Sequence, residues 1–210
     1  MTTNTTFFGG LKVASVQWSL SRVTKDTRTR GGAVIRSENG AALWTGTATL
    51  APGYHAAQGE IEALLAELTG AGQFVLAYDP RYNGPKADPG GVILGASTPT
   101  IHTLDADNRR LRITGLPSGY VLSIGDYLGF EYGSNPTRYA LHRATSTATA
   151  SVGGLTPFFS VTPHIRSGAA VGAAVSLLRP VCKCLVTADY GTGAPLITQG
   201  AQIGLQQVLR

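Results

Sequence analysis

Four histidines are the side chains of this sequence best suited to act as general bases near neutral pH. His55 precedes a predicted helix and is expected on an exposed loop. His102, His142 and His164 fall in predicted β segments, and none has a serine or cysteine nearby in a recognisable nucleophile motif. The sequence therefore predicts no catalytic residue and no enzyme.

Two pairs of residues have metal-binding types but lack the required spacing. Asp105 and Asp107 lie in LDADNRR, yet a calcium loop also needs a glycine and a distal glutamate, so we expect a turn capped by these carboxylates. Cys182 and Cys184 would point to one face of a strand as unpaired neighbours, and no further Cys or His supports a zinc site. We expect two buried thiols, no metal and no cofactor.

A cluster of basic residues is the strongest electrostatic feature. It comprises five side chains accompanied only by Asp26: Arg22, Lys25, Arg28, Arg30 and Arg36. This density suits a contact with phosphates or with an acidic protein surface. A solvated hairpin is favoured over nucleic-acid binding, because no aromatic residues are interleaved for base stacking. A contact with a neighbouring subunit stays open.

The composition favours a mainly β protein. Charged residues make up 14% of the 210 positions, well below the usual quarter or so. Glycines and prolines recur about every ten residues, and only one convincing helix is present. The N-terminus has no basic segment followed by an apolar run, and no stretch approaches the roughly 20 apolar residues of a membrane span. We expect neither a signal peptide nor a span, and synthesis in a reducing cytosol.

The elements expected to carry these residues begin with a first strand at 11–23, irregular near Ser15. A flexible basic loop at 24–33 leads to a short strand at 33–36 and to a hairpin turn at SENG, with Asn39-Gly40 at its tip. A strand at 43–50, an amphipathic helix at 58–69 and a strand at 73–78 follow. The helix has an apolar stripe of Ile61, Leu64, Leu65 and Leu68, and a solvated face of Glu60, Glu62 and Glu67.

The pattern changes after the turn-rich segment 81–91. Short strands are then predicted at 91–94, 98–104, 110–114, 120–124, 127–132, 138–144, 158–161 and 170–178. Strands this short and regular favour a small barrel or sandwich. Arg179-Pro180 marks a second boundary, and strands at 181–188 and 201–209 return to the first sheet. Residues 89–179 are therefore predicted to be inserted into a domain made of 1–88 and 180–210.

The order of these parts resembles a known family. WTGTA at 44–48 precedes the helix, FVLAYDPR at 74–81 follows it, and then come LPSGYVLSIGDYLGF at 116–130, VTPHIR at 161–166 and LLRPVCKCLV at 177–186. This succession resembles the distal tail proteins of long-tailed phages and phage-like particles. The resemblance covers nearly the whole chain, through short motifs in a characteristic order.

The resemblance implies a structural virion protein at the tail tip. Such proteins look like a belt domain, here a β-sandwich with one helix, carrying an added domain that is sometimes an OB-like barrel. Six copies would form a ring joining the tail tube protein to the hub or baseplate protein, with a channel for DNA in transit. The basic residues would form an intersubunit arm, and the belt core would contain Trp18, Trp44, Leu64, Leu65, Leu68 and Phe74.

Two other functions are compatible with the sequence. The barrel could bind receptors or host sugars through its tyrosines, although core or rim positions are favoured for them: Tyr120, Tyr127, Tyr132 and Tyr139. A tail tube or tail-completion protein is the closer alternative.

Overall fold

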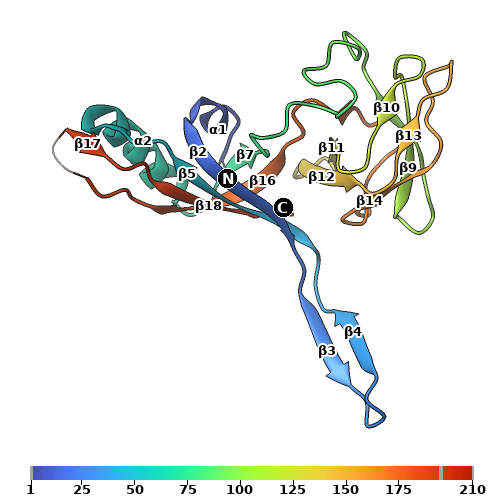
Figure 1. Ribbon diagram of the computed structural model, residues 1–210, viewed down its shortest axis with the longest axis horizontal. Helices are drawn as coiled ribbons and strands as arrows, with labels where there is room; N and C mark the ends of the chain where they lie inside the picture. Colours follow the sequence, from blue (N-terminus) through green and yellow to red (C-terminus); the bar gives the residue numbers. More distant parts are fainter. Residues whose placement is uncertain (1, 194–195, 210) are drawn as a thin grey trace.

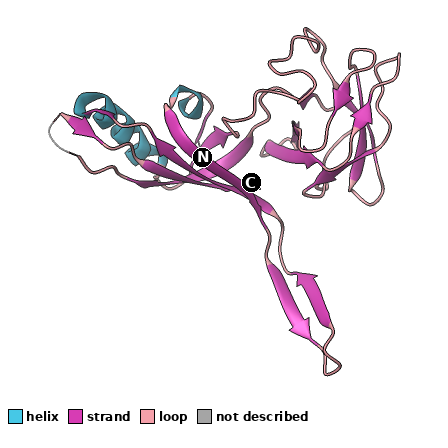
Figure 2. Cartoon of the chain, viewed as in Figure 1, coloured by secondary structure: helices cyan, strands magenta, loops and turns pink. Residues whose placement is uncertain are grey.

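The computed structural model describes residues 2–193 and 196–209 and is mainly β, with 42% strand and 9% helix. The fold contains two six-stranded sheets, and the helices lie beside the first of them (Figures 1 and 2). The elements up to residue 77 are β1 (Thr2–Asn4), α1 (Phe7–Gly10), β2 (Val13–Ser21), β3 (Thr24–Arg28), β4 (Val34–Glu38), β5 (Leu43–Leu50), β6 (Gly53–Tyr54), α2 (His55–Leu68) and β7 (Gln73–Ala77). The later elements are β8 (Thr100–Leu104), β9 (Arg110–Thr114), β10 (Val121–Leu122), β11 (Tyr127–Tyr132), β12 (Arg138–Ala144), β13 (Ala148–Thr149), β14 (Phe159–Thr162), β15 (Val175–Ser176), β16 (Cys182–Asp189), β17 (Ile197–Thr198) and β18 (Gln202–Gln207).

The first sheet, here called the terminal sheet, is built from both ends of the chain. Its strand order is β1-β7-β16-β18-β5-β2, and only the β1–β7 pair is parallel. The pairing of β2 with β5 slips between Val13 and Ser15, which confirms the predicted irregularity. Alternate residues of β5 are buried on one face of the sheet, where Trp44 and Leu50 join the core.

The helix α2 covers the buried face of the terminal sheet. It begins at His55, three residues before the predicted start, because His55, Ala56 and Ala57 can propagate a helix once β6 ends. His55 is therefore helical, whereas a loop was predicted. Gly72, at a φ of +81°, adopts a left-handed backbone conformation after the helix.

Of the six residues predicted for the belt core, five are buried and one is not. Trp18, Trp44 and Leu65 lie in the core cluster of the terminal sheet, and Leu68, the last residue of α2, is also buried. Leu64 is 47% exposed. Successive helical residues are about 100° apart, so Leu64 lies beside the buried stripe that Leu65 occupies.

Phe74 is buried on the opposite face of the terminal sheet from α2. The residue after it in β7, Val75, pairs with Cys184 on the helix side, so the alternation of the strand turns Phe74 away. The ammonium group of Lys183 lies 4.3 Å from the centre of the Phe74 ring. The two cysteines are free and buried, with their sulfur atoms 3.5 Å apart, as expected.

The second sheet, here called the barrel sheet, is nearly closed. Its order is β15-β11-β12-β14-β9-β8, and a bridge between Thr100 and Ala174 brings its two edges together. The interior contains large buried side chains that include Ile101, Leu111 and Phe159. The predicted ranges of β9, β11 and β12 are confirmed.

Two predicted elements of the middle segment are wrong. Residues 91–94 form turns, because the carboxylate of Asp88 accepts hydrogen bonds from the backbone N–H groups of Ile93 and Leu94. Of the strand predicted at 170–178, only Val175–Ser176 forms a strand, which pairs with β11. None of the helices described in the chain is both long enough and apolar enough to cross a membrane.

Candidate interaction site: the basic arm and its base

The arm, defined as residues 24–38, is a two-stranded hairpin that projects from the body of the molecule (Figure 1). β3 pairs with β4, and the turn lies at 29–33, where Thr29 and Ala33 exchange hydrogen bonds. The predictions of a flexible loop at 24–33 and a hairpin tip at Asn39-Gly40 are therefore wrong. The ladder of β3 with β4 is separate from that of β2 with β5, and Asn39-Gly40 lies in the connection between β4 and β5 at the base of the arm.

Every residue of the arm is exposed, including apolar ones. Val34 and Ile35 are 56% and 58% exposed, and Val23 just before the arm is 57% exposed. An isolated two-stranded hairpin is only marginally stable in water. An arm with this composition is therefore suited to a surface outside its own chain.

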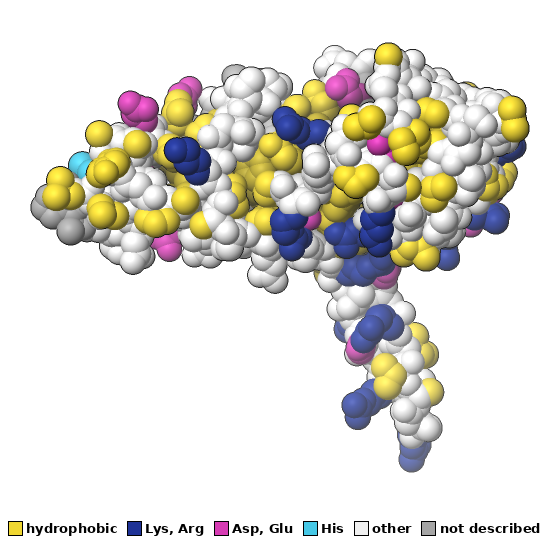
Figure 3. Space-filling model, turned by 45° about the horizontal axis from the view of Figure 1, so that its top comes forward, with side chains coloured by type: hydrophobic (Ala, Val, Ile, Leu, Met, Phe, Trp, Pro, Cys, Tyr) yellow, Lys and Arg dark blue, Asp and Glu magenta, His cyan; other side chains and the backbone are white. Residues whose placement is uncertain are grey.

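The five predicted basic residues are gathered along the arm and at its base (Figure 3). Arg22 precedes β3, Lys25 and Arg28 lie in β3, Arg30 lies in the turn and Arg36 lies in β4. The guanidinium of Arg36 donates two hydrogen bonds to Asp26, which lower the pKa of that carboxyl. Within the described part of the chain, Lys25, Arg28 and Arg30 form no ion pair.

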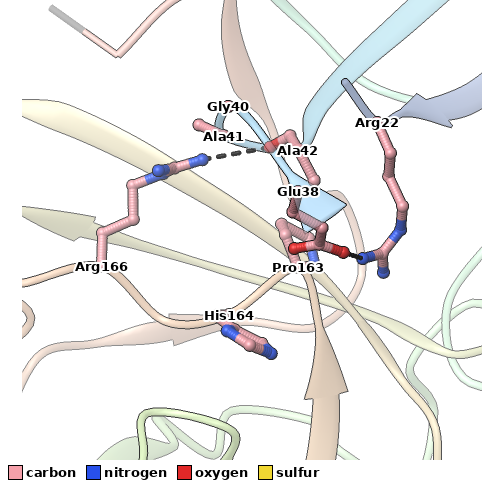
Figure 4. A pocket seen from close by; sticks show the side chains of 8 residues that line it. All are labelled: Arg22, Glu38, Gly40, Ala41, Ala42, Pro163, His164 and Arg166. Carbon is pink, nitrogen blue, oxygen red and sulfur yellow. Dashed lines mark hydrogen bonds and ion pairs between the residues drawn. The ribbon is translucent and has the colours of Figure 1, made fainter. Parts of the chain in front are cut away.

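Hydrogen bonds connect the base of the arm to β14 of the barrel sheet and to the residues that follow it. Arg22 pairs with Glu38 at 2.6 Å and donates a second hydrogen bond of 3.0 Å to the hydroxyl of Thr162. Arg166 donates a 3.0 Å hydrogen bond to the carbonyl oxygen of Ala42 (Figure 4).

A hollow of about 200 Å³ lies at this base. Arg22, Glu38, His164 and Arg166 line it together with backbone around Ala41 (Figure 4). Sequence reasoning did not place Thr162, His164 or Arg166 in the site. Arg22 and Thr162 are 140 positions apart in the sequence, so no local spacing links them, and VTPHIR contributes only to the family resemblance.

A second polar cluster joins the two sheets. Tyr127 packs edge-on against Trp44 and Tyr82, and its hydroxyl donates to Asp79 and accepts from Arg143. The Arg143 guanidinium also lies 4.4 Å from the centre of the Tyr127 ring. Burial raises the pKa of Tyr127 to about 12, so the phenol is protonated at neutral pH.

The carboxylate of Asp79 is held ionised in this cluster. Burial alone would raise its pKa, but hydrogen bonds from Arg81 and from Tyr127 outweigh burial and lower it. The cluster thus contains a charged acid, a neutral phenol and two guanidinium groups, and the guanidinium of Arg143 lies against the rings of Trp44 and Tyr127. The contacts of the cluster connect the terminal sheet to the barrel sheet.

The tyrosines considered for sugar binding lie mostly inside the protein. Tyr120, Tyr127 and Tyr132 are 3%, 4% and 6% exposed, and Tyr139 is half-buried. A binding surface for sugars would need exposed aromatic faces, so this arrangement agrees with the favoured core positions.

The histidines are dispersed. His142 is buried, stacks on Phe130 and donates from Nδ1 to the carbonyl oxygen of Pro163. His55, His102 and His164 are exposed in separate places. Asp105 and Asp107 accept backbone hydrogen bonds in a turn, as predicted. In residues 2–193 and 196–209, no group of three or more His, Cys, Asp or Glu could hold a metal ion.

The open face of the terminal sheet, opposite α2, is uncharged over three strands. β2, β5 and β18 contain no Asp, Glu, Lys or Arg. Thr45, Thr47 and Ser19 lie on this face, with the hydroxyls of Ser19 and Thr45 3.2 Å apart. Its surface is therefore polar without carrying charge.

No protein-family model matches the chain, and no curated protein matches it.

Proposed function

We propose that this chain is a structural ring subunit of a phage tail tip, a distal tail protein without catalytic activity. In this proposal, residues 1–88 and 180–210 form a sandwich-like belt domain, and residues 89–179 form an inserted OB-like barrel. Six copies close into a ring in the virion. The ring joins the tail tube protein to the hub or baseplate protein and leaves a channel for DNA.

The observation that carries the proposal is the projecting arm. The arm projects from the body, is charged at its base and exposes apolar residues. Hydrogen bonds from Arg22 to Thr162 and from Arg166 to Ala42 hold its base. A protein that works alone gains nothing from exposing Val34 and Ile35 on a marginally stable hairpin. An arm that reaches a neighbouring subunit accounts for both properties.

The uncharged open face also supports the proposal. Binding of DNA depends mainly on neutralisation of its phosphates by Lys and Arg. A channel lined by β2, β5 and β18 would let DNA pass without holding it. The five residues of the basic cluster lie on the arm and at its base, where an acidic protein surface is the expected partner.

Removal of the arm tests the proposal. Residues 24–38 are replaced by Asn-Gly, a two-residue turn that joins Val23 to Asn39, whose backbone N–H already donates to the carbonyl oxygen of Val23. We expect the wild-type chain to sediment as a ring and the variant as a folded monomer, because the deleted residues are all exposed. Sedimentation velocity gives the assembly, and far-UV circular dichroism checks the fold.

An unchanged oligomer in the variant would remove the arm from the interface. Electron microscopy of the wild-type chain separates the remaining functions. Discrete rings with six subunits support the tail-tip adaptor, whereas open stacks of rings would favour a tail tube protein. A wild-type monomer that adsorbs to cells would favour a receptor-binding module.

A further inference from the structure

The two faces of the arm differ in chemistry. Side chains that pair across β3 and β4 share a face, so Asp26 and Arg36 lie together on one side and form an ion pair. Arg28 and the exposed Val34 lie on that same side, whereas the other face contains Lys25, Thr27 and Ile35 and no acidic residue. On that face Ile35 is exposed, Lys25 has no ion-pair partner among the described residues, and Arg30 follows in the turn.

The outer face of α2 has the complementary pattern. Glu60, Leu64 and Glu67 are spaced by four and three residues, which places them in one stripe. All three are exposed, and α2 contains no Lys or Arg. A hollow of about 280 Å³ adjoins Leu64 and Glu67 beside the N-terminal strand. The stripe is thus an apolar residue between two acids.

The arm and α2 of one chain lie at opposite ends of the terminal sheet (Figure 1). β5 begins at Leu43 near the arm and ends at Leu50 near α2, and eight strand residues span about 27 Å. Figure 3 shows Lys and Arg on the arm and acidic side chains at the far end of the molecule. Contact between these surfaces requires a second copy of the chain.

We propose that the arm of one copy lies on the outer face of α2 in the next copy. Ile35 packs against Leu64, and Lys25 and Arg30 lie beside Glu60 and Glu67. The contact is head-to-tail, and such a contact closes into a ring when the rotation between copies permits it. This inference rests on the proposed ring function and specifies the surface that receives the arm.

Charge reversal tests the contact because either surface can be changed separately. The helix variant is Glu60→Lys with Glu67→Lys, and the arm variant is Lys25→Glu with Arg30→Glu. Each places like charges in the interface, so we expect at least a tenfold rise in the concentration needed for half-assembly, on the order expected for close charged pairs. Sedimentation velocity over a concentration series measures it.

Mixing the two variants gives the decisive measurement. In an equimolar mixture, each reversed arm meets a reversed helix and each native arm meets a native helix, so we expect assembly to return to within about threefold of wild type. A chain that carries all four substitutions should also assemble. The matched control, Asp107→Lys with Glu131→Lys, reverses two exposed acids of the barrel segment and should assemble as wild type.

The outcomes separate this inference from the proposed function. Wild-type rings that persist in both variants would overturn the docking on α2 while leaving the ring function standing. Failure of the mixture to recover would overturn it as well. A wild-type chain that never assembles at any concentration would overturn the ring function itself. Loss of duplex-DNA binding in the arm variant, with assembly unchanged, would instead assign the arm to nucleic acid.

Discussion

At the scale of a single residue, His142 is a buried neutral base. The imidazole ring is buried in the barrel sheet, and this burial lowers the pKa of His142 to about 4 from an ordinary value of 6.5. The unfolded chain therefore binds a proton between pH 6.5 and pH 4 that the folded chain does not bind. Stability from this residue is complete above pH 6.5 and is lost as the pH falls toward 4.

We expect His142 to contribute about 3 kcal/mol to the fall in unfolding free energy over that pH range. His142→Phe keeps an aromatic ring beside Phe130 but cannot be protonated, so its stability should fall less steeply. Urea unfolding at several pH values measures the difference. The exposed His102→Phe variant is the control and should keep the wild-type slope. Identical slopes for the wild-type and His142→Phe proteins would contradict the prediction.

Single residues also show where sequence reasoning reaches its limit. The burial of Leu65 and Leu68 follows from helical spacing, but Leu64 fits the same apolar stripe and lies outside it. Gln58 is buried in the helix because its side chain donates to the carbonyl oxygen of Ala51. Such a partner, seven residues away in the preceding segment, is not visible in a hydrophobic pattern.

At the level of an element, β5 is shaped by a close contact between Gly46 and Trp18. These residues pair across β2 and β5, and a Cβ atom at position 46 would lie 2.2 Å from a ring atom of Trp18. The Trp18 ring is itself stacked on Trp44, with the ring centres 6.4 Å apart. Only glycine leaves room for this arrangement.

Gly46→Ala should therefore destabilise the protein by about 1–3 kcal/mol through overpacking. The matched control is Gly59→Ala in α2, where an added Cβ meets nothing within 4 Å. That change should stabilise the protein by roughly 0.5–1 kcal/mol, because alanine favours the helix. Thermal unfolding of both variants gives the comparison. Equal effects of the two substitutions would show that Trp18 moves aside without cost.

The elements of this chain were predictable where local pattern determines them. β9, β11 and β12 alternate clearly and end at turn residues, so their ranges match. The arm was misread because Asn39-Gly40 is a strong local turn signal. The pairing of β3 with β4 overrides that signal and places the hairpin tip at 29–33. β1 is too short, at three residues, to produce a pattern.

For the whole molecule, the junction at Tyr127 couples the two sheets. Tyr127 and Leu141 belong to the barrel sheet but lie in the core cluster of the terminal sheet. The indole N–H of Trp44 donates a 2.7 Å hydrogen bond to the carbonyl oxygen of Leu141. The proposed domains therefore share buried contacts, and they should unfold together.

Tyr127→Ala should break this coupling and cost about 3–5 kcal/mol, because it removes a buried ring and the hydroxyl that Arg143 contacts. Both tryptophans of the chain, Trp18 and Trp44, lie in the terminal sheet, and Trp44 contacts Leu141, so their fluorescence reports on that sheet and on its junction with the barrel sheet. In urea, fluorescence and circular dichroism should give one transition for the wild type and separated transitions for the variant. Tyr139→Ala, at a half-buried position, should keep them coincident. Separated transitions in the wild type would contradict the coupling.

The buried cysteines have a practical consequence for studies of assembly. Both thiols are fully enclosed, and burial raises the pKa of the Cys182 thiol, so neither is accessible to maleimide reagents in the folded chain. A Gly31→Cys substitution in the turn of the arm, where an added Cβ meets nothing within 4 Å, would then supply the only thiol that a spin label modifies. Native Cys182 and Cys184 could stay in place, and the label would report the separation of arm tips between subunits.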